Sequence, residues 1–87
     1  MNKIKIKKGL ISQKIGNKLK IFDGEESILY TLNASASFIF EKLKAGTRRE
    51  KLIEQLVKKY AISVKRAEKD SDSLIGLLAG KNIIEKD

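Results

Sequence analysis

The chain has 87 residues, of which 41% are apolar and 34% charged, a balance that fits one small globular domain and excludes a disordered tail. It contains no cysteine and no histidine, which excludes disulfides, thiolate chemistry, Ser-His-Asp catalysis and most transition-metal sites. We therefore expect neither an enzyme nor a bound cofactor or metal. No apolar run approaches the roughly 20 residues of a membrane span, and the lysine-rich start lacks a signal-peptide core, so we expect a cytoplasmic protein.

The net charge of +8 is concentrated in the first quarter of the chain. Residues 1–22 carry seven lysines and no acidic residue, a balance of +7, whereas residues 23–87 carry twelve basic and eleven acidic side chains, a balance of +1. A lysine-rich N-terminal arm, here residues 1–8, can protect a sheet edge from pairing, attract an acidic partner or contact nucleic acid. The position of the charge leaves these three interpretations open.

Three short runs rich in β-favouring residues predict an antiparallel three-stranded meander. The runs are separated by turn sequences, Gly16-Asn17 in the first case and residues 23–26 in the second. In a meander the first and third strands form the two edges. The predicted strands are residues 10–15, 19–22 and 28–32.

From Asn33 onward the apolar spacing changes to the 3.6-residue period of amphipathic helices. Asn33 and Ser63 are expected to cap a first and a third helix, and Thr47 with Glu50 has the form of a capping box for a second. Each predicted helix has one apolar face. These faces comprise Ala36, Ile39, Phe40 and Leu43; Ile53, Leu56, Val57 and Tyr60; and Ala67, Ser71, Leu74 and Leu78.

Three strands followed by three helices predict an α+β fold with a winged helix-turn-helix-like arrangement. The sequence contains no repeat, linker or low-complexity segment. We therefore expect a single domain over residues 1–87, in which residues 1–8 form a basic arm and Ile83-Ile84 a short apolar tail.

The order and spacing of these residues resemble the PqqD family, the small peptide chaperones of pyrroloquinoline quinone (PQQ) biosynthesis. Their relatives are the RiPP recognition elements, which serve ribosomally made, enzymatically modified peptides. The similarity covers roughly residues 9–85, with Phe40, Ser71 and Asn82 standing where the family prefers tryptophan, an apolar residue and glycine. The residues that carry it are Tyr30-Thr31-Leu32-Asn33, Ser35-Ala36, Ile39-Phe40-Glu41, Leu43 and Gly46, then Ile53, Leu56, Tyr60, Asp70, Leu74-Ile75, Leu78 and Ile83-Ile84.

This resemblance implies a non-catalytic domain that binds the leader segment of a precursor peptide. It also implies that the domain presents the peptide to a modifying enzyme, in the PqqD case a radical S-adenosylmethionine enzyme. In such domains the peptide adds as an extra antiparallel strand beside the third strand, in the groove under the third helix. The peptide-binding residues expected here are Ser27, Ile28, Leu29, Tyr30, Thr31 and Leu32 with Arg66, Asp70, Ser73 and Leu77.

The third predicted strand has the properties that strand addition requires. Residues 27–32 contain no proline and no charge, the two common means by which proteins block an edge strand. The same edge could instead pair with the N-terminal arm, with the C-terminal tail or with a second copy in a homodimer. These alternatives stay open at this point.

A winged-helix DNA-binding protein is the alternative function. The third predicted helix offers Lys65, Arg66 and Lys69, but acidic residues alternate with them, and a near-neutral helix is poor at neutralising phosphates. Arg48-Arg49 at the start of the second helix keeps this alternative open. A purely structural subunit is a third possibility. We expect a peptide partner, no specific nucleic acid and no membrane.

Overall fold

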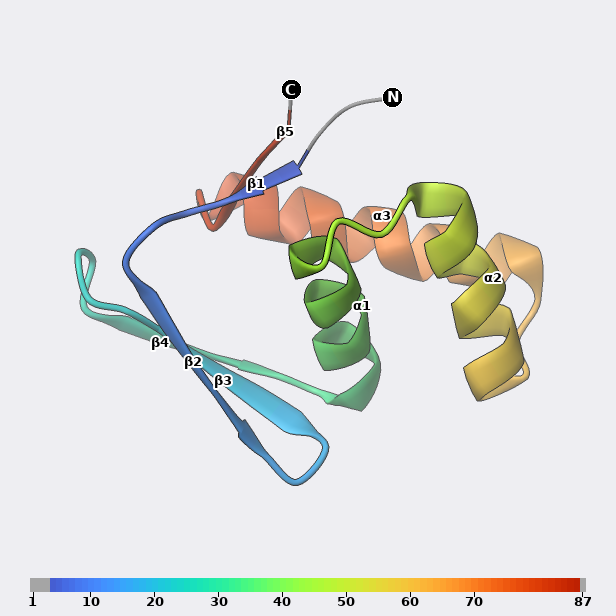
Figure 1. Cartoon of the computed structure of the whole chain (residues 1–87), viewed down its shortest axis with the longest axis horizontal. Coiled ribbons are helices and arrows are strands. Elements are labelled where there is room, and N and C mark those ends of the chain that lie inside the picture. The colour runs from blue at the N-terminus through green and yellow to red at the C-terminus, as the bar shows by residue number, and fades with distance from the viewer. Residues whose placement is uncertain (1–3, 87) are drawn as a thin grey trace.

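The chain forms a three-stranded meander followed by three helices, and its two ends pair in a second, two-stranded sheet (Figure 1). The computed structural model describes residues 4–86, so residues 1–3 of the predicted basic arm lie outside it. The predicted α+β architecture is confirmed. The elements are β1 (Ile4–Ile6), β2 (Leu10–Ile15), β3 (Lys18–Asp23), β4 (Ile28–Leu32), α1 (Ala34–Lys44), α2 (Arg49–Tyr60), α3 (Val64–Gly80) and β5 (Ile84–Lys86).

The meander has the strand order β2-β3-β4, so β2 and β4 are its edges, as predicted. Gly16 adopts the left-handed conformation in the β2–β3 turn, with φ at 63°. The inner face of the sheet buries Leu19, Ile21 and Leu32 against the helices. The outer face, turned away from the helices, carries the alternate residues of the three strands. We define this outer face as Ile11, Gln13, Ile15, Lys18, Lys20, Phe22, Leu29 and Thr31.

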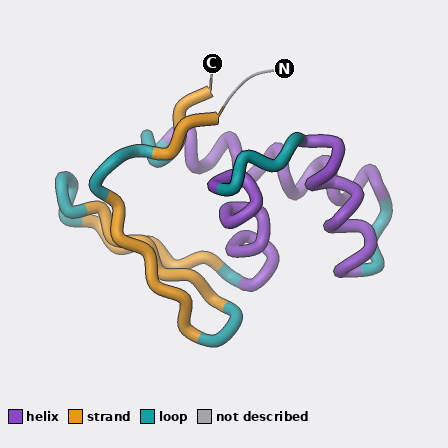
Figure 2. The backbone as a smooth tube through the Cα atoms, viewed as in Figure 1, coloured by secondary structure: helices purple, strands orange, loops and turns teal. Residues whose placement is uncertain are grey.

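The small sheet joins the beginning of the described chain to its end. Ile4 pairs with Lys86 and Ile6 with Ile84, while the Lys7 backbone N–H donates to the Ile83 carbonyl over 2.8 Å. Residues 4–6 of the arm therefore pair with the tail, and within residues 4–86 neither segment pairs with β4. The tube in Figure 2 shows this second pair of strands separate from the meander.

The predicted caps of the first and third helices are confirmed. The Asn33 side chain accepts a hydrogen bond from the Ala36 N–H over 2.9 Å, and the Ser63 hydroxyl accepts one from the Arg66 N–H over 3.0 Å. Each bond satisfies a backbone donor that the first turn of a helix otherwise leaves without a partner.

The predicted capping box at Thr47 is wrong. Helix α2 begins at Arg49 with Arg48 as its N-cap, and no side chain caps it. The N–H of Thr47 instead donates to the carbonyl of Lys42 over 2.9 Å, which assigns Thr47 to the C-terminal turn of α1. Only four residues separate α1 from α2, and the N–H of Thr47 is used in the hydrogen bonding that ends α1 and is not available to a cap of α2.

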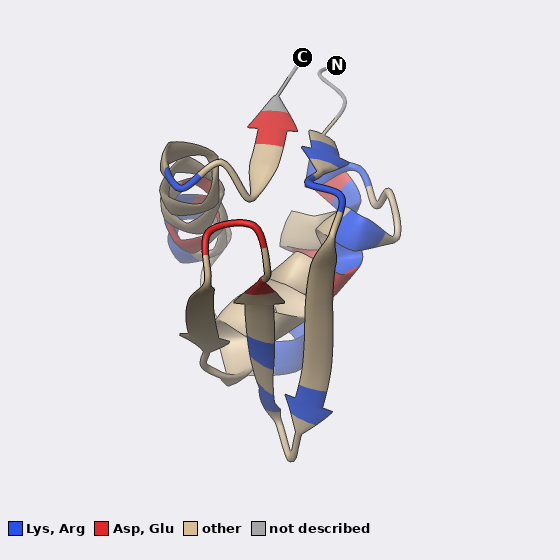
Figure 3. Cartoon of the chain, turned by 90° about the vertical axis from the view of Figure 1, so that its left-hand side faces the viewer, with Lys and Arg blue, Asp and Glu red and all other residues tan. Residues whose placement is uncertain are grey.

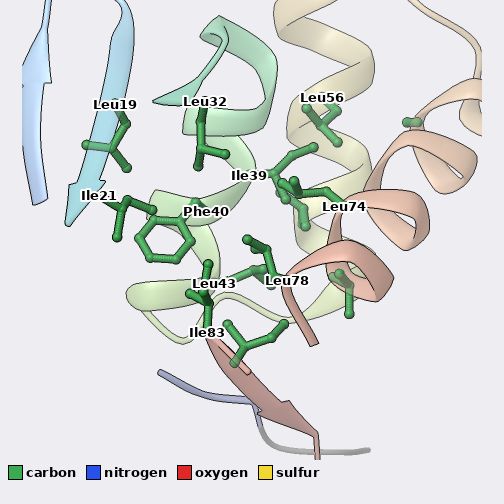
Figure 4. Close-up of a cluster of buried hydrophobic side chains, with 14 of the residues drawn as sticks. Leu19, Ile21, Leu32, Ile39, Phe40, Leu43, Leu56, Leu74, Leu78 and Ile83 are labelled. Carbon is green, nitrogen blue, oxygen red and sulfur yellow. The ribbon is translucent and has the colours of Figure 1, made fainter. Parts of the chain in front are cut away.

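Helix α1 lies at the centre of the core, between the meander and the other two helices (Figure 4). All four residues of the predicted α3 face are buried, whereas Ala36, Val57 and Tyr60 of the other two faces are only half-buried. Leu52 is fully buried although the predicted α2 face omitted it. The apolar stripe of α2, which packs on α3, is therefore wider than one line of i, i+3 and i+4 positions.

Candidate peptide-binding site

Strand β4 presents an open edge. Strand β3 pairs with one of its sides, and within residues 4–86 no strand pairs with the other. The side chains of Ile28 and Leu29 are 42% and 57% exposed, Thr31 is exposed, Tyr30 is half-buried and Leu32 is buried. An edge of this kind offers a row of backbone N–H and C=O groups to an incoming strand.

A hollow of about 760 Å³ borders the first half of this edge. Ile28 and Tyr30, two residues apart on β4, both line it, because alternate residues of a strand share a face. The rest of its wall comes from the arm, from the β3–β4 turn and from the segment after α3. These other lining residues are Lys5, Ile6, Lys7, Lys8, Glu25, Glu26, Lys81, Asn82 and Glu85.

The end of α3 contacts β4 through a cation–π interaction. The Lys81 ammonium lies 5.6 Å from the centre of the Tyr30 ring, and the Lys81 N–H donates to the Leu77 carbonyl over 3.1 Å. Asn82 follows with a left-handed φ of 60°, a conformation that asparagine tolerates well. Figure 3 shows α3 and β4 on the same side of the molecule. The hollow therefore lies between the open edge and the C-terminal end of α3.

Asp23 holds the rim of the hollow in place. This carboxylate is 1% exposed; it accepts a hydrogen bond from the Lys7 ammonium over 2.9 Å and two more from the N–H groups of Glu25 and Glu26. The Lys7 hydrogen bond lowers the pKa of Asp23 and raises the pKa of Lys7, against the opposing effect of burial. Asp23 thereby connects the β1–β2 segment to the turn that precedes β4.

The four α3 residues predicted to line the groove fall into two groups. Leu77 is 52% exposed, as expected for an apolar side chain outside the core, and Ser73 is exposed. Arg66 and Asp70 bind each other, with Arg66 Nε 3.2 Å from an Asp70 carboxylate oxygen. None of the four lines the hollow, to which the segment directly after α3 contributes Lys81 and Asn82 instead. Their role in binding stays a prediction.

The lining residues that were not among the predicted peptide-binding residues include several near the two ends of the chain. Lys81 and Asn82 line the hollow because they follow α3, and residues 5–8 line it because β1 pairs with β5. The position of Lys81 directly after Gly80, the last residue of α3, is visible in the sequence and could have indicated it as a lining residue. The contribution of residues 5–8 could not be predicted in this way, because it depends on the pairing of β1 with β5, which are almost the whole chain apart.

The opposite edge of the meander has different surroundings. A smaller hollow of about 360 Å³ lies beside β2, lined by residues that include Ser12, Lys14 and Glu41. The Lys14 ammonium lies 3.3 Å from the Glu41 carboxylate, so an exposed ion pair lines this hollow. Strand β2 therefore carries a charged side chain whereas β4 carries none, and charged residues of other segments line both hollows.

The profile of a known protein family, described as coenzyme PQQ synthesis protein D (PqqD), matches residues 20–84. The chain belongs to the PqqD family. Domains of this family and the related RiPP recognition elements are non-catalytic peptide-binding proteins, so the chain is not an enzyme. A search of the curated proteins finds no match.

Two solved structures share the fold. The structure of TbiB1 in complex with the TbiA(beta) leader peptide superposes with a TM-score of 0.86 at 23% identity, over 93% of this chain and 94% of that one. The structure of lasso peptide synthetase B1 complexed with the leader peptide gives a TM-score of 0.88 at 18% identity, over 95% and 98% of the two chains. The predicted family fold is confirmed by both.

Two further observations concern residues 4–86 as a whole. No helix in this range is both long enough and apolar enough to span a membrane. The same range holds no group of three or more carboxylate side chains arranged to bind a metal ion.

Proposed function

We propose that this PqqD-family chain binds the leader segment of a ribosomally made precursor peptide by strand addition at β4 and delivers it to a peptide-modifying enzyme. The single observation that carries the proposal is the open, uncharged edge of β4 beside a hollow of about 760 Å³. The leader peptides in the two similar structures support it. We expect the enzyme to be of the radical S-adenosylmethionine class, by family resemblance.

Two contributions to the binding free energy are expected in this mode. Each backbone hydrogen bond between peptide and β4 contributes about 0.5–1.5 kcal/mol in net terms. Alternate peptide side chains would enter the hollow beside Ile28 and Tyr30, and their burial contributes roughly 25 cal/mol per Å² of apolar surface. The side chain of Leu77 is exposed near the C-terminal end of α3, where a longer peptide could contact it.

The DNA-binding alternative has less support. Two of the five cations that such a surface would use form exposed ion pairs, because Arg49 binds Asp72 over 2.9 Å and Arg66 binds Asp70. Phosphate binding through these two arginines would first have to break the pairs. We therefore expect weak, salt-sensitive and sequence-independent DNA binding at most.

Amide shift mapping by NMR tests the proposed site. The labelled chain is titrated with synthetic peptides that cover the short reading frames flanking its gene, and labelled DNA duplexes serve as a second titrant. We expect one peptide to shift residues 28–32 and Lys81 while residues 10–15 stay unchanged. Shifts at β2 or at Arg48-Arg49 that spare residues 28–32 would contradict the proposal, as would tight, sequence-specific binding of a duplex.

A further inference from the structure

The outer face of the meander carries a continuous apolar row. Ile11 of β2 pairs with Phe22 of β3, and Phe22 pairs with Leu29 of β4. The three side chains are 66%, 40% and 57% exposed. Because neighbouring strands lie about 4.8 Å apart, side chains in register on one face touch along the row. An apolar surface that crosses a whole sheet is a recognised feature of protein interfaces.

Nothing within residues 4–86 covers this row. The helices pack on the inner face through Leu19, Ile21 and Leu32, so they lie on the other side of the sheet. A peptide added at the β4 edge would lie in the plane of the sheet, beside the row and not on it. The row is therefore left exposed by the fold and by the proposed function alike.

The charges on the outer face are of one sign. Lys18 and Lys20 are its only charged residues, and in Figure 3 the acidic residues of the meander lie at the end of β3 and in the β3–β4 turn. In that turn Glu25 lies 3.6 Å from the Lys7 ammonium. Two copies of the chain placed face to face would bring like charges together, which disfavours a homodimer through this face.

We propose that the outer face is the docking surface for the enzyme that modifies the bound peptide, and that the enzyme presents apolar side chains next to carboxylates there. This inference rests on the proposed function. Leu29 connects the two sites, because its side chain belongs to the row while its backbone lies on the edge that the peptide would extend. An enzyme on the outer face would therefore contact the added peptide strand directly.

Site-specific photo-crosslinking in cells of the source organism tests the docking surface. The full chain carries p-benzoylphenylalanine in place of Phe22, and a control chain carries it in place of Val64, which is 56% exposed at the start of α3. We expect position 22 to crosslink to a peptide-modifying enzyme at an apolar segment that contains Asp or Glu. Position 64 should not crosslink to that enzyme.

A pair of matched variants then tests the chemistry. Ile11→Glu with Lys18→Glu alters the outer face, whereas Val64→Glu with Lys51→Glu makes the same kinds of exposed change on the helices. We expect the first pair to lower the crosslinking yield at position 22 at least tenfold and the second pair to leave it within twofold. Both should leave the NMR response to the peptide unchanged.

Three outcomes would overturn the docking proposal: a crosslink to a second copy of the chain, a crosslink to a protein without peptide-modifying activity, and no crosslink at position 22. An equal loss of crosslinking yield at position 22 with both variant pairs would contradict the proposal that the enzyme presents apolar side chains and carboxylates to the outer face. If the unaltered chain binds peptide at β4 and any of these outcomes is seen, the docking surface is wrong and the proposed function stands. If the unaltered chain binds no peptide, the proposed function itself fails.

Discussion

The two edges of the meander have the same backbone chemistry and different side chains. Strand β2 is exposed over most of its length, more so than β4, which buries Leu32 and half-buries Tyr30. Exposure alone would therefore favour β2 as the site of strand addition. The β2 edge, however, carries Lys14 in an ion pair with Glu41, while β4 has no charge and borders the larger hollow. Charge and neighbouring volume, more than exposure, distinguish an edge suited to binding from one protected against it.

The largest expected effect comes from proline substitutions at the two edges. Leu29→Pro and Thr31→Pro each remove one backbone donor from β4. Alternate residues of a strand direct their N–H groups to the same edge, and the register that starts at the two-residue β2–β3 turn directs both of these away from β3. We expect at least one of the two to weaken peptide binding about tenfold or more, a loss of roughly 1.4 kcal/mol. Isothermal titration calorimetry measures the affinity, and circular dichroism confirms folding.

The matched controls are Ser12→Pro and Gln13→Pro on β2. Whichever of them folds should bind the peptide within about twofold of the unaltered chain, a difference of roughly 0.4 kcal/mol. A tenfold loss from a β2 proline, with both β4 prolines binding normally, would assign the peptide to the opposite edge.

The second prediction concerns Asp23, which fixes the turn at the β4 end of the meander. Asp23→Asn removes the ion pair with Lys7 and leaves a lysine without its main partner, so we expect the melting temperature to fall by about 5 °C or more near neutral pH. Differential scanning calorimetry measures the change. An unchanged melting temperature would show that the backbone pairing of Lys7 with Ile83 holds the arm by itself.

The pH dependence of stability follows from the same pair. The pKa of Asp23 is lowered from its ordinary 3.8, so its contribution is present above that pH and is lost as the pH falls through the lowered value. The pKa of Lys7 is raised from its ordinary 10.5, so its contribution is complete below that pH and is lost as the pH rises through the raised value. The difference in melting temperature between Asp23→Asn and the unaltered chain should therefore be greatest between these limits and should shrink in acid below pH 3.8.

The smallest expected effect is that of Lys14→Ala on the β2 edge. Its ion pair with Glu41 is exposed on both sides, and such pairs contribute about 0–1 kcal/mol. We expect urea denaturation to show a loss in that range and peptide affinity to stay the same. If the variant gained a second peptide-binding site at β2, the lysine would be shown to protect that edge actively.

The sequence predicted features that depend on neighbours in the chain. The turn at Gly16 and the caps Asn33 and Ser63 each have a local physical cause, and all three were found where expected. The cap at Thr47 failed because a nearby helix end used its N–H. Local sequence therefore predicts a helix cap or a turn well when the residues belong to one helix or turn, and less well when two helix ends lie close together.

The site was predictable only in part for the same reason. The absence of charge and proline in β4 is visible in the sequence, and the strand is indeed an open edge. The hollow is not visible, because it needs the pairing of Ile6 with Ile84 and the ion pair of Lys7 with Asp23. The apolar row requires the register of three strands, since Ile11, Phe22 and Leu29 are separated by turns of different length.

The pairing of Ile4 with Lys86 gives the fold a ring-like topology. The described part of the chain, residues 4–86, begins and ends at one place, where β1 and β5 lie side by side (Figure 1). A short glycine-serine bridge can therefore join the ends, and a new start can be placed between Gly16 and Asn17 without altering any strand pair. By the same geometry the whole domain can be inserted into a surface loop of a larger protein, with its point of attachment at the β1–β5 pair and both β4 and the outer face left accessible.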